Sequence, residues 1–447
     1  MIKAALIASL ALAFASQPPA MPPLPESRQE AYEFYALEWL DDGYPGVRNP
    51  DGELVPHPAY GAYVIRDYLT QYRQTGEARF LEAAELVAAR AVARMDLFKG
   101  ALVFWYRPRK DLLVSDHVIY SGLIQARYLQ AFSELYEVTG DRRHLATAEQ
   151  VLASLALSTE EGGVLRPRPG GGAVIEEWPD PAMGNFVLNG WTTAMLIVHE
   201  YAERHGSEAA RALFERNLIA LKAMLALFDM PEIANSRYQL AGISAMRLRM
   251  SPVGGSWVSG EVVVPGEGIV PIAESGDDRW TNFVISPPGY RAPIANIVLN
   301  YVSYPEPNVV RVTVLAEHAG EIGLDLLIGD YDPLASMIVD RDWAEIGRAE
   351  VTPGVNEIAF EIPWEAARFT AYPTNFRKEI GGRHFNVYHF LHIENLSRLA
   401  AITGEPSFDA YADRWQTYAD ERWPEMPLYA DAGVELRAYF DLEGVQQ

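Results

Sequence analysis

The stretch Val174–Trp191, VIEEWPDPAMGNFVLNGW, combines the features of a reactive loop with those of a helix start. Two adjacent carboxylates, Glu176 and Glu177, precede a tryptophan and two prolines, and an apolar helical pattern follows. Because proline interrupts a helix, we expect both glutamates to lie on a loop that leads into a helix. Loops on a rigid scaffold often carry chemistry, and a carboxylate beside an indole is partly desolvated, which suits proton transfer.

The same stretch also has a purely structural interpretation. Glu176 and Glu177 would then be solvated loop charges, and Asn189 would cap the helix, since asparagine is a preferred N-cap residue. The stretch by itself does not decide between the two interpretations.

Three further segments predict repeated helical hairpins. TGEARFLEAAELVAARAV begins at Thr75, TGDRRHLATAEQVLASLA at Thr139 and TGEPSFDAYADRWQTYAD at Thr403. In each, we expect the glycine to end one helix and the acidic residue to help start the next. Repeated hairpins of this kind predict an α/α toroid or barrel built from residues 27–245 and 376–447. A plain helical bundle is the alternative.

Between residues 246 and 375 the helical period is lost and glycine, proline and valine become frequent. Short segments with strand character are Glu261–Val264, Phe283–Ile285, Ile297–Val302, Val309–Leu315, Leu324–Leu327 and Glu357–Ile362. Such segments predict an antiparallel β-sandwich inserted in the helical domain, and hence the α+β class. The sandwich would either bind ligand at the edge of a cleft or serve as scaffold.

Composition limits the classes of function. The 447 residues are 49% hydrophobic and carry a formal net charge of −23. This charge repels nucleic acid and anionic membranes, so we expect neither as a partner. Aromatic residues make up 11%, which suits sugar binding but is also normal in a large helical core. The chain has no cysteine, which excludes thiol catalysis and zinc–thiolate sites.

The first residues have the pattern of a secretion signal. Lys3, a short apolar run and a small-x-small site near Ala15 predict a signal peptide over residues 1–15, followed by a proline-rich lead-in over 16–26. We therefore expect a secreted or periplasmic protein. No other apolar stretch is long enough to predict a membrane span.

Binding a polyanion would require a local basic pocket in this acidic chain. The candidate basic groups are Arg107, Arg109, Lys110, Arg166, Arg168, Arg377, Lys378 and Arg383. Each cluster is equally compatible with a solvated turn, and only convergence in space would make it a binding site.

Two other segments place polar side chains at predicted helix starts. Tyr60 and Tyr63 share a face where a proline-rich loop enters a helix. Further on, Ser115 or Asp116 is expected to cap a helix that carries Tyr120 and Gln125.

A third segment, near the C-terminus, places His389 and His392 on one helical face beside Tyr388. No third ligand follows at a matching spacing, so this pair does not predict a metal site.

Several of these segments together resemble the D-glucuronyl C5-epimerase family. The segments are IEEWPDPAMGNFVLNGW, ARALFERNLIALKAMLALFD, VYHFLHIENLSRL and IYSGLIQARYLQAF. The resemblance implies an enzyme that inverts C5 of glucuronate residues within a polysaccharide, without cofactor or metal. It also implies a homodimer.

The resemblance assigns roles to individual residues. Glu177 takes the place of the family's catalytic glutamate and Tyr388 that of a catalytic tyrosine, while a further tyrosine falls on Tyr63 or, less well, on Tyr60. Tyr238 loosely matches another family tyrosine, but the Asp-Leu-Arg-His sequence that accompanies it is missing here. The remaining expected substrate-binding residues are Arg107, Arg109, His117, Tyr120, Asn185, Asn189 and His392.

The reaction removes the proton at C5 and returns it to the other face, through an enolate-like dianion. We expect Glu177 and Tyr388 to act on opposite faces, with Arg383, His389 or His392 lowering the pKa of the phenol. Two alternatives remain open. A polysaccharide lyase would form the same carbanion but expel the C4-linked sugar, and a glycan-binding protein would have no catalysis.

Overall fold

The structure, a computed structural model, describes residues 19–107, 118–179, 184–231, 234–251, 257–264, 268–271, 280–281, 294–302, 308–316, 318–332, 337–363, 376–380, 383–386 and 388–422. The chain divides into two compact units. The first comprises residues 1–95 and 107–116, and the second comprises residues 96–106 and 117–447.

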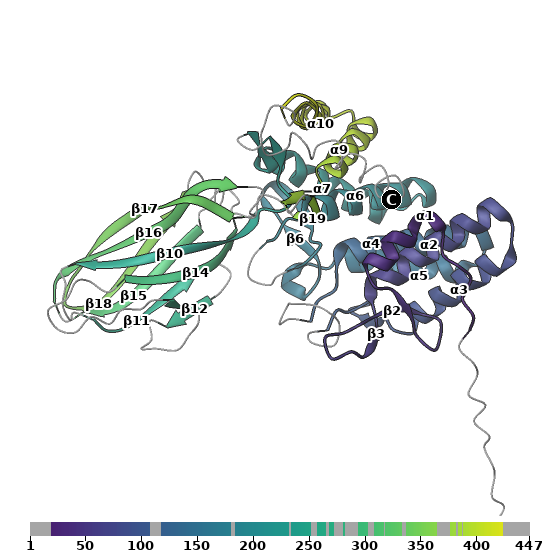
Figure 1. Cartoon of the computed structure of the whole chain (residues 1–447), viewed down its shortest axis with the longest axis horizontal. Coiled ribbons are helices and arrows are strands. Elements are labelled where there is room, and N and C mark those ends of the chain that lie inside the picture. Colours follow the sequence, from purple (N-terminus) through teal and green to yellow (C-terminus); the bar gives the residue numbers. More distant parts are fainter. Residues whose placement is uncertain are drawn as a thin grey trace, which may run out of the picture. The chain divides into compact units, whose positions relative to one another are not determined.

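Helices dominate the chain on both sides of a β-rich segment (Figure 1). The helices are α1 (Glu26–Phe34), α2 (Pro58–Thr75), α3 (Ala78–Val92), α4 (Gly122–Thr139), α5 (Arg142–Leu155), α6 (Leu188–His205), α7 (Glu208–Met224), α9 (His389–Thr403) and α10 (Pro406–Thr417). Short strands join them: β1 (Glu38–Trp39), β2 (Pro45–Arg48), β3 (Leu54–Pro56), β4 (Asp96–Phe98), β5 (Ala101–Val103), β6 (Leu165–Pro167), β7 (Ala173–Ile175), β8 (Asp229–Met230), β9 (Asn235–Ser236), β19 (Phe376–Ile380) and β20 (Arg383–Asn386).

The predicted helical hairpins are confirmed at all three Thr-Gly segments. Gly76, Gly140 and Gly404 end α2, α4 and α9 with φ of 72°, 70° and 67°, a left-handed conformation that glycine adopts at little cost. The next residue in each case is the N-cap of the following helix. Gly206, with φ of 64°, joins α6 to α7 in the same way. Gly206 stands between a histidine and a serine and not between a threonine and an acidic residue, so the Thr-Gly pattern did not predict this hairpin.

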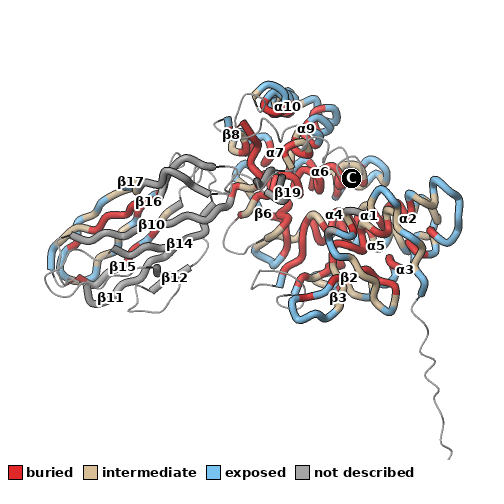
Figure 2. Tube along the Cα trace, in the orientation of Figure 1, coloured by how far each residue is buried: buried red, intermediate tan, exposed pale blue. Residues whose placement is uncertain are grey.

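In the second unit, α4, α6 and α9 lie side by side, each paired with the helix that follows it. Tyr238 connects the beginnings of α6 and α9, because its carbonyl accepts the Leu188 N–H and its ring packs on Tyr388. One to two turns further on, the Asn395 amide donates to the Thr193 hydroxyl at 3.1 Å. Helices α6 and α9 are therefore parallel. Helix α6 is buried along most of its length (Figure 2). Closure of these hairpins into a toroid stays a prediction.

The β-rich segment contains two antiparallel sheets. Strands β13 (Trp280–Thr281), β14 (Ile294–Val302), β10 (Ala241–Ser251), β16 (Gly320–Asp332) and β17 (Met337–Val351) form one sheet in that order. Strands β12 (Gly268–Pro271), β11 (Trp257–Val264), β15 (Asn308–Ala316) and β18 (Gly354–Ile362) form the other. Five of the six predicted strand segments lie within these strands, and Phe283–Ile285 lies outside the described residues. The sandwich and the domain boundaries at 245/246 and 375/376 stay predictions.

One buried amide fastens the loop of the paired glutamates to the helices. Asn217 of α7 is fully buried, and its Oδ1 accepts both the Ile175 backbone N–H at 2.9 Å and the Trp191 indole N–H at 2.8 Å. Its Nδ2 donates to the Leu213 carbonyl at 2.8 Å. Asn217 therefore ties β7, which ends just before Glu176, to both α6 and α7.

Replacing this amide tests its contribution to stability. Asn217→Leu removes the acceptor of two buried donors, and each unpaired donor costs about 1–3 kcal/mol. We predict that the free energy of unfolding, measured by urea denaturation, falls by about 2–5 kcal/mol. The exposed neighbour Arg216 supplies the control, because Arg216→Gln should change it by less than about 0.5 kcal/mol. An Asn217→Leu variant as stable as the native chain would contradict this role.

Candidate functional site

Glu176 is fully buried and serves as a structural clamp. Its Oε1 accepts the Arg166 Nε–H at 2.8 Å, and its Oε2 accepts the backbone N–H of Phe186 at 3.0 Å. Burial raises the pKa of Glu176, an effect that Arg166 and the Phe186 amide oppose. Because both oxygens are bound, this carboxylate holds the loop closed and is not placed for proton transfer.

The clamp holds Phe186 in an unusual conformation. Its φ is 51°, in the left-handed region that bulky residues rarely adopt. The Arg168 guanidinium lies 5.4 Å from the centre of the Phe186 ring. The adjacent Asn185 amide donates to the Trp178 carbonyl at 2.7 Å. Strain of this kind persists only where surrounding contacts enforce it, and it is common at functional sites.

Two glycines let the loop approach the starts of two helices. A Cβ at Gly122, the first residue of α4, would lie 2.5 Å from the Glu176 carbonyl oxygen. A Cβ at Gly190, in the first turn of α6, would lie 2.1 Å from Glu177 Oε2. Glu177 is therefore close to the α6 backbone at Gly190, and it is only 7% exposed. The interpretation of Glu176 and Glu177 as solvated loop charges is therefore wrong.

Tyr388 lies near the same end of α6. It is the N-cap residue of α9, and its ring centre is 5.2 Å from that of Tyr238. The Tyr238 carbonyl in turn accepts the N–H of Leu188, the first residue of α6, at 2.9 Å. The first turn of α6 thus contacts Glu177 directly and is linked to Tyr388 through Tyr238. The two residues predicted as acid and base lie in the same compact unit.

Behind Tyr388, two histidines share one serine. Ser236 Oγ lies 2.8 Å from Nδ1 of His389 and 2.8 Å from Nδ1 of His392, and the Ser236 N–H donates to His389 at 3.1 Å. His389 Nε2 lies 3.0 Å from the Trp415 carbonyl, so it must carry the proton. Neither the histidine pattern nor its spacing indicated that a serine lies between the two rings.

Both histidines are fully buried, and burial lowers the pKa of His389 to about 4 and that of His392 well below its usual value. Both are therefore uncharged near neutral pH. The hypothesis that His389 or His392 lowers the pKa of Tyr388 by its positive charge is wrong. The side chain of Arg383, the third group considered, lies outside the description of the structure.

One predicted substrate-binding residue, Tyr120, has a structural role instead. Tyr120 is fully buried and its hydroxyl donates to the Ser154 carbonyl at 2.9 Å, so it belongs to the core. The helix predicted to be capped by Ser115 or Asp116 begins instead after Ser121, whose Oγ accepts the Ile124 N–H.

Asn189 is not the cap of α6, because Val187 holds that position. It is 5% exposed, and Oδ1 of Asn189 has no hydrogen-bond partner among the described residues. Nε2 of His392 is likewise buried without a hydrogen-bond partner among the described residues. Both side chains keep a polar atom available, and their substrate contacts stay predictions.

Tyr60 and Tyr63 lie on α2, in the other compact unit from Glu177. The Tyr60 hydroxyl donates to the Tyr35 carbonyl at 2.7 Å, and burial raises the pKa of Tyr60 to about 12. Tyr63 is half-buried. The role of Tyr63 or Tyr60 as a third catalytic residue stays a prediction.

The predicted basic clusters do not provide a pocket in the part of the chain that the structure describes. Arg166 is bound to Glu176 and Arg168 lies over Phe186, so both brace the loop. Arg107 is exposed, whereas Arg109 and His117 lie outside the described residues. Within those residues, no three histidine, aspartate or glutamate side chains form a metal-binding group, and no helix has the length and apolar character needed to cross a membrane.

The family resemblance is confirmed over part of the chain. Residues 105–251 match the family model described as D-glucuronyl C5-epimerase C-terminus. This range contains the clamp, Glu177, the first turn of α6 and Tyr238, although Tyr388 follows it in sequence. Glu177 thus lies within the part of the chain that is similar to this epimerase family.

Comparisons with individual proteins cover less of the chain. The uncharacterized protein MJ1128 of Methanocaldococcus jannaschii is 31% identical over 110 residues, which are 24% of this chain and 36% of that protein. The chain therefore spans about a third of the length of this curated relative.

Among solved structures, a sugar epimerase from a ruminal bacterium superposes with a TM-score of 0.32 at 15% identity, over 44% of this chain and 51% of the other. An α-mannanase of glycoside hydrolase family 76 from Bacteroides thetaiotaomicron gives 0.30 at 16% identity, over 45% and 54%. The likeness to both is loose.

Because Gly190 contacts Glu177, we predict that replacing this helical glycine with alanine lowers stability instead of raising it. Gly→Ala inside a helix normally stabilises a protein by about 1 kcal/mol. At Gly190 the new methyl group would overlap the Glu177 carboxylate, so we predict that Gly190→Ala lowers the free energy of unfolding by about 1–3 kcal/mol. Urea denaturation measures this change.

A double variant separates the contact from other causes. In the Glu177→Gly background the overlap is gone, and Gly190→Ala should become neutral or stabilising. An equal loss of stability in both backgrounds would show that Glu177 does not lie on Gly190.

The buried histidines predict acid sensitivity. A histidine titrates near 6.5 in the unfolded chain, whereas the pKa of His389 in the folded state is about 4. Between these values the unfolded state binds more protons, so stability is complete above about pH 6.5 and is lost as the pH falls toward 4. We predict a slope of up to about 1.4 kcal/mol per pH unit for each histidine.

Denaturation of His389→Gln and His392→Gln from pH 4 to 7 checks this slope, which should be shallower in both variants. The exposed His318 supplies the control, because His318→Gln should leave the slope unchanged. If the pH dependence of stability were equal in the native chain and all three variants, His389 and His392 would not be its source.

Proposed function

We propose that the protein is a C5-epimerase acting on glucuronate residues within a polysaccharide. Glu177 and Tyr388 exchange the C5 proton on opposite faces of the sugar ring, and Tyr63 assists on the phenolic side. One group removes the proton and the other returns it, so the configuration at C5 inverts and no bond of the chain is cleaved. Tyr238, Asn185 and Asn189 are proposed to contact the sugar beside them.

The observation that supports this proposal is that two adjacent carboxylates have different contacts. Glu176 is bound by a guanidinium and an amide, whereas Glu177 lies on the first turn of α6. The same turn is bound by the Tyr238 carbonyl, and the Tyr238 ring packs on Tyr388. A glutamate and a phenol near one helix end are the two acid–base groups that this reaction requires.

The helix ends supply the electrostatic part of the mechanism. The first turns of α4 and α6 both contact the Glu176–Glu177 segment, and α9 begins at Tyr388. Each helix start carries a partial positive charge of roughly half an elementary charge. Such ends favour a sugar carboxylate and the negative charge that builds up when C5 loses its proton. They also compensate locally for the net charge of −23.

The substrate class, the location and the assembly belong to the same proposal. The substrate is a uronate polysaccharide such as heparosan or a bacterial exopolysaccharide, of low sulfation because the chain is acidic. A signal peptide over residues 1–15 would direct the protein to the periplasm or the exterior, and two copies would form a homodimer. Neither cofactor nor metal takes part in the proposed steps.

Incubation with unsulfated uronate polysaccharides in deuterated water tests the reaction. We predict that NMR detects deuterium at C5 without chain cleavage. Glu177→Gln and Tyr388→Phe each remove one acid–base group and should lower the exchange rate by at least about a hundredfold. Both variants should remain folded.

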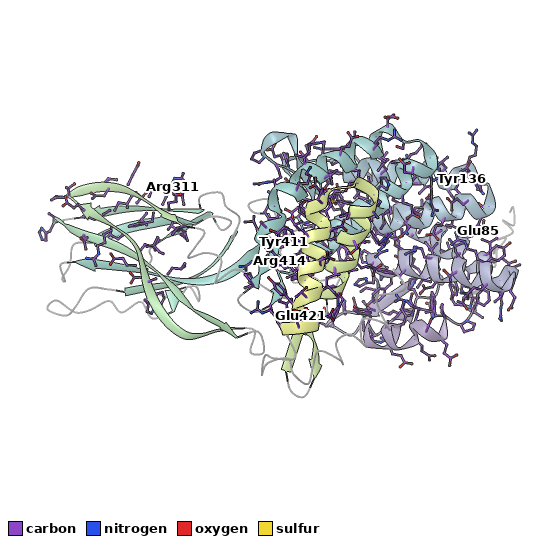
Figure 3. The ribbon with its side chains drawn as sticks, turned by 90° about the horizontal axis from the view of Figure 1, so that it is seen from above. Glu85, Tyr136, Arg311, Tyr411, Arg414 and Glu421 are labelled. Carbon is purple, nitrogen blue, oxygen red and sulfur yellow. The ribbon has the colours of Figure 1, made fainter. Side chains whose placement is uncertain are left out.

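Matched substitutions on α7 and α10 serve as controls. Glu215→Gln on α7 and Tyr411→Phe on α10 change the same groups away from the site and should leave the rate unchanged. Figure 3 labels Tyr411. Ultraviolet absorbance from a new C4–C5 double bond would establish the lyase instead. Binding without exchange, unaffected by Glu177→Gln or Tyr388→Phe, would establish a glycan-binding protein.

A further inference from the structure

His392 has one ring nitrogen with a hydrogen-bond partner and one without. Its Nδ1 lies 2.8 Å from the Ser236 hydroxyl oxygen, whereas its Nε2 is buried and has no hydrogen-bond partner among the described residues. The ring is fully buried, so bulk water does not satisfy this nitrogen. A buried polar atom in this state is costly, and a bound group is one reason for a protein to keep it. Whether Nε2 donates or accepts depends on the tautomer.

The contacts of Ser236 determine this tautomer. His389 Nε2 carries a proton because it faces the Trp415 carbonyl, so Nδ1 of neutral His389 is an acceptor. The Ser236 hydroxyl lies 2.8 Å from that nitrogen and must donate to it, since the alternative places two lone pairs 2.8 Å apart. The other contact of this hydroxyl then requires Nδ1–H of His392 to donate to Ser236 Oγ. Nε2 of His392 is therefore unprotonated and can only accept.

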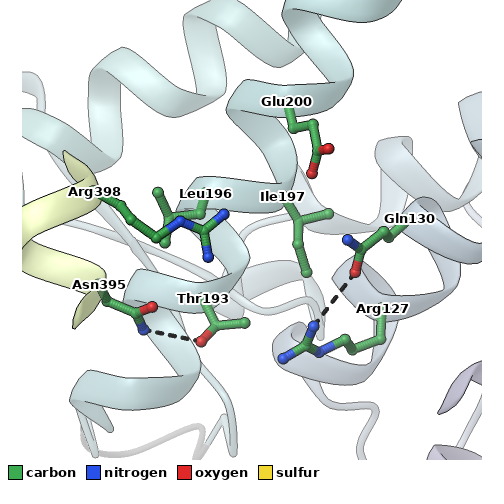
Figure 4. Close-up of a pocket in the computed structure, with 8 residues that line it drawn as sticks. All are labelled: Arg127, Gln130, Thr193, Leu196, Ile197, Glu200, Asn395 and Arg398. Carbon is green, nitrogen blue, oxygen red and sulfur yellow. Dashed lines mark hydrogen bonds between the residues drawn. The ribbon is translucent and has the colours of Figure 1, made fainter. Parts of the chain in front are cut away.

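A second acceptor without a partner lies at the same level of the neighbouring helix. Helices α6 and α9 are parallel, and the Asn395 amide donates to the Thr193 hydroxyl at 3.1 Å, as Figure 4 shows. One turn nearer the helix starts, Asn189 precedes Thr193 and His392 precedes Asn395. Asn189 is 5% exposed, and its Oδ1 is buried without a hydrogen-bond partner in the described part of the chain. Each helix therefore presents one acceptor at this level.

Both acceptors are within one helical turn of the candidate site. Gly190, the residue next to Asn189, is the one that Glu177 approaches. The His392 N–H donates to the Tyr388 carbonyl at 2.9 Å, so Tyr388 lies one turn before His392. A group bound by the two acceptors would therefore lie beside the proposed acid–base residues.

Two acceptors select the kind of group that binds them. A carboxylate would bring further lone pairs to a buried place, which is unfavourable. A cation would lose its hydration without meeting a charge on either acceptor, because an asparagine amide and a neutral imidazole carry none. A hydroxyl group is small, neutral and supplies the missing donor.

We propose that Nε2 of His392 and Oδ1 of Asn189 form a subsite that accepts hydrogen bonds from a hydroxyl group. Ser236 is the positioning residue that holds His392 in the accepting tautomer. That the hydroxyl belongs to a uronate substrate rests on the proposed function, whereas the tautomer does not.

Nitrogen-15 NMR of the histidine rings tests the tautomer in the chain without ligand. Near pH 7, His392 should show a protonated Nδ1 and an unprotonated Nε2, and loss of the signals in His392→Gln assigns them. Ser236→Ala removes the acceptor of the Nδ1 proton and should shift the population toward the other tautomer. Ser397→Ala, the same change at an exposed serine of α9, should leave it unchanged. A native His392 with a protonated Nε2 overturns the proposal.

Titration with an unsulfated glucuronate tetrasaccharide tests the subsite. Binding should shift the His392 Nε2 signal as this nitrogen accepts a hydrogen bond. Calorimetry should show that Ser236→Ala and Asn189→Ala each weaken binding by about threefold to tenfold, the effect of one hydrogen bond, whereas Ser397→Ala binds like the native chain. Native affinity in both Ser236→Ala and Asn189→Ala overturns the subsite.

The C5 exchange assay in deuterated water separates this inference from the proposed function. Exchange without a shift of the His392 signal on binding overturns the subsite and leaves the epimerase standing, and a water molecule held permanently at Nε2 would give this result. A shift without exchange supports the subsite and contradicts the epimerase. If neither occurs, both are overturned.

Discussion

The ion pair between Glu176 and Arg166 is the constraint on which the candidate site depends. A carboxylate with no exposed surface is stable only when its oxygens are bound, and here a guanidinium and the Phe186 amide bind both. The same contacts hold Phe186 in a left-handed conformation and close the loop. Glu177, the next residue, is then carried onto the first turn of α6. Glu176 thus holds the loop, and the neighbouring Glu177 is the residue for which we propose a catalytic role.

Three helices begin near Glu177, and their starts determine the electrostatic environment of its carboxylate. Parallel helices α6 and α9 begin near each other, and the first residue of α4 contacts the same loop. Their partial positive charges favour an anionic group at this place, although the chain carries a net charge of −23. The match of residues 105–251 to the C5-epimerase model covers the α4 and α6 parts of this arrangement. Catalysis by the whole chain is our proposal from these features.

Local signals in the sequence predicted local structure well. The Thr-Gly segments gave helix ends because a left-handed glycine and a following cap are properties of adjacent residues. Segments of strand character likewise located five of the nine strands from β10 to β18. The start of α4 was misplaced because Ser115, Asp116 and Ser121 are all good N-cap residues. Contacts between distant segments could not be predicted: the resemblance singled out Glu177, but nothing in the sequence indicated that Glu176 binds Arg166 and the Phe186 amide.

The most direct test compares Glu176→Gln with Glu177→Gln by urea denaturation under identical conditions. The two substitutions are chemically the same and lie one residue apart, so they differ only in what each carboxylate contacts. Our account predicts that Glu176→Gln, which leaves Arg166 without its buried counter-charge, lowers the free energy of unfolding by about 3–5 kcal/mol. Glu177→Gln should change it by less than about 1 kcal/mol. Equal losses of stability, or a larger loss for Glu177→Gln, would contradict the assignment of one carboxylate to structure and the other to catalysis.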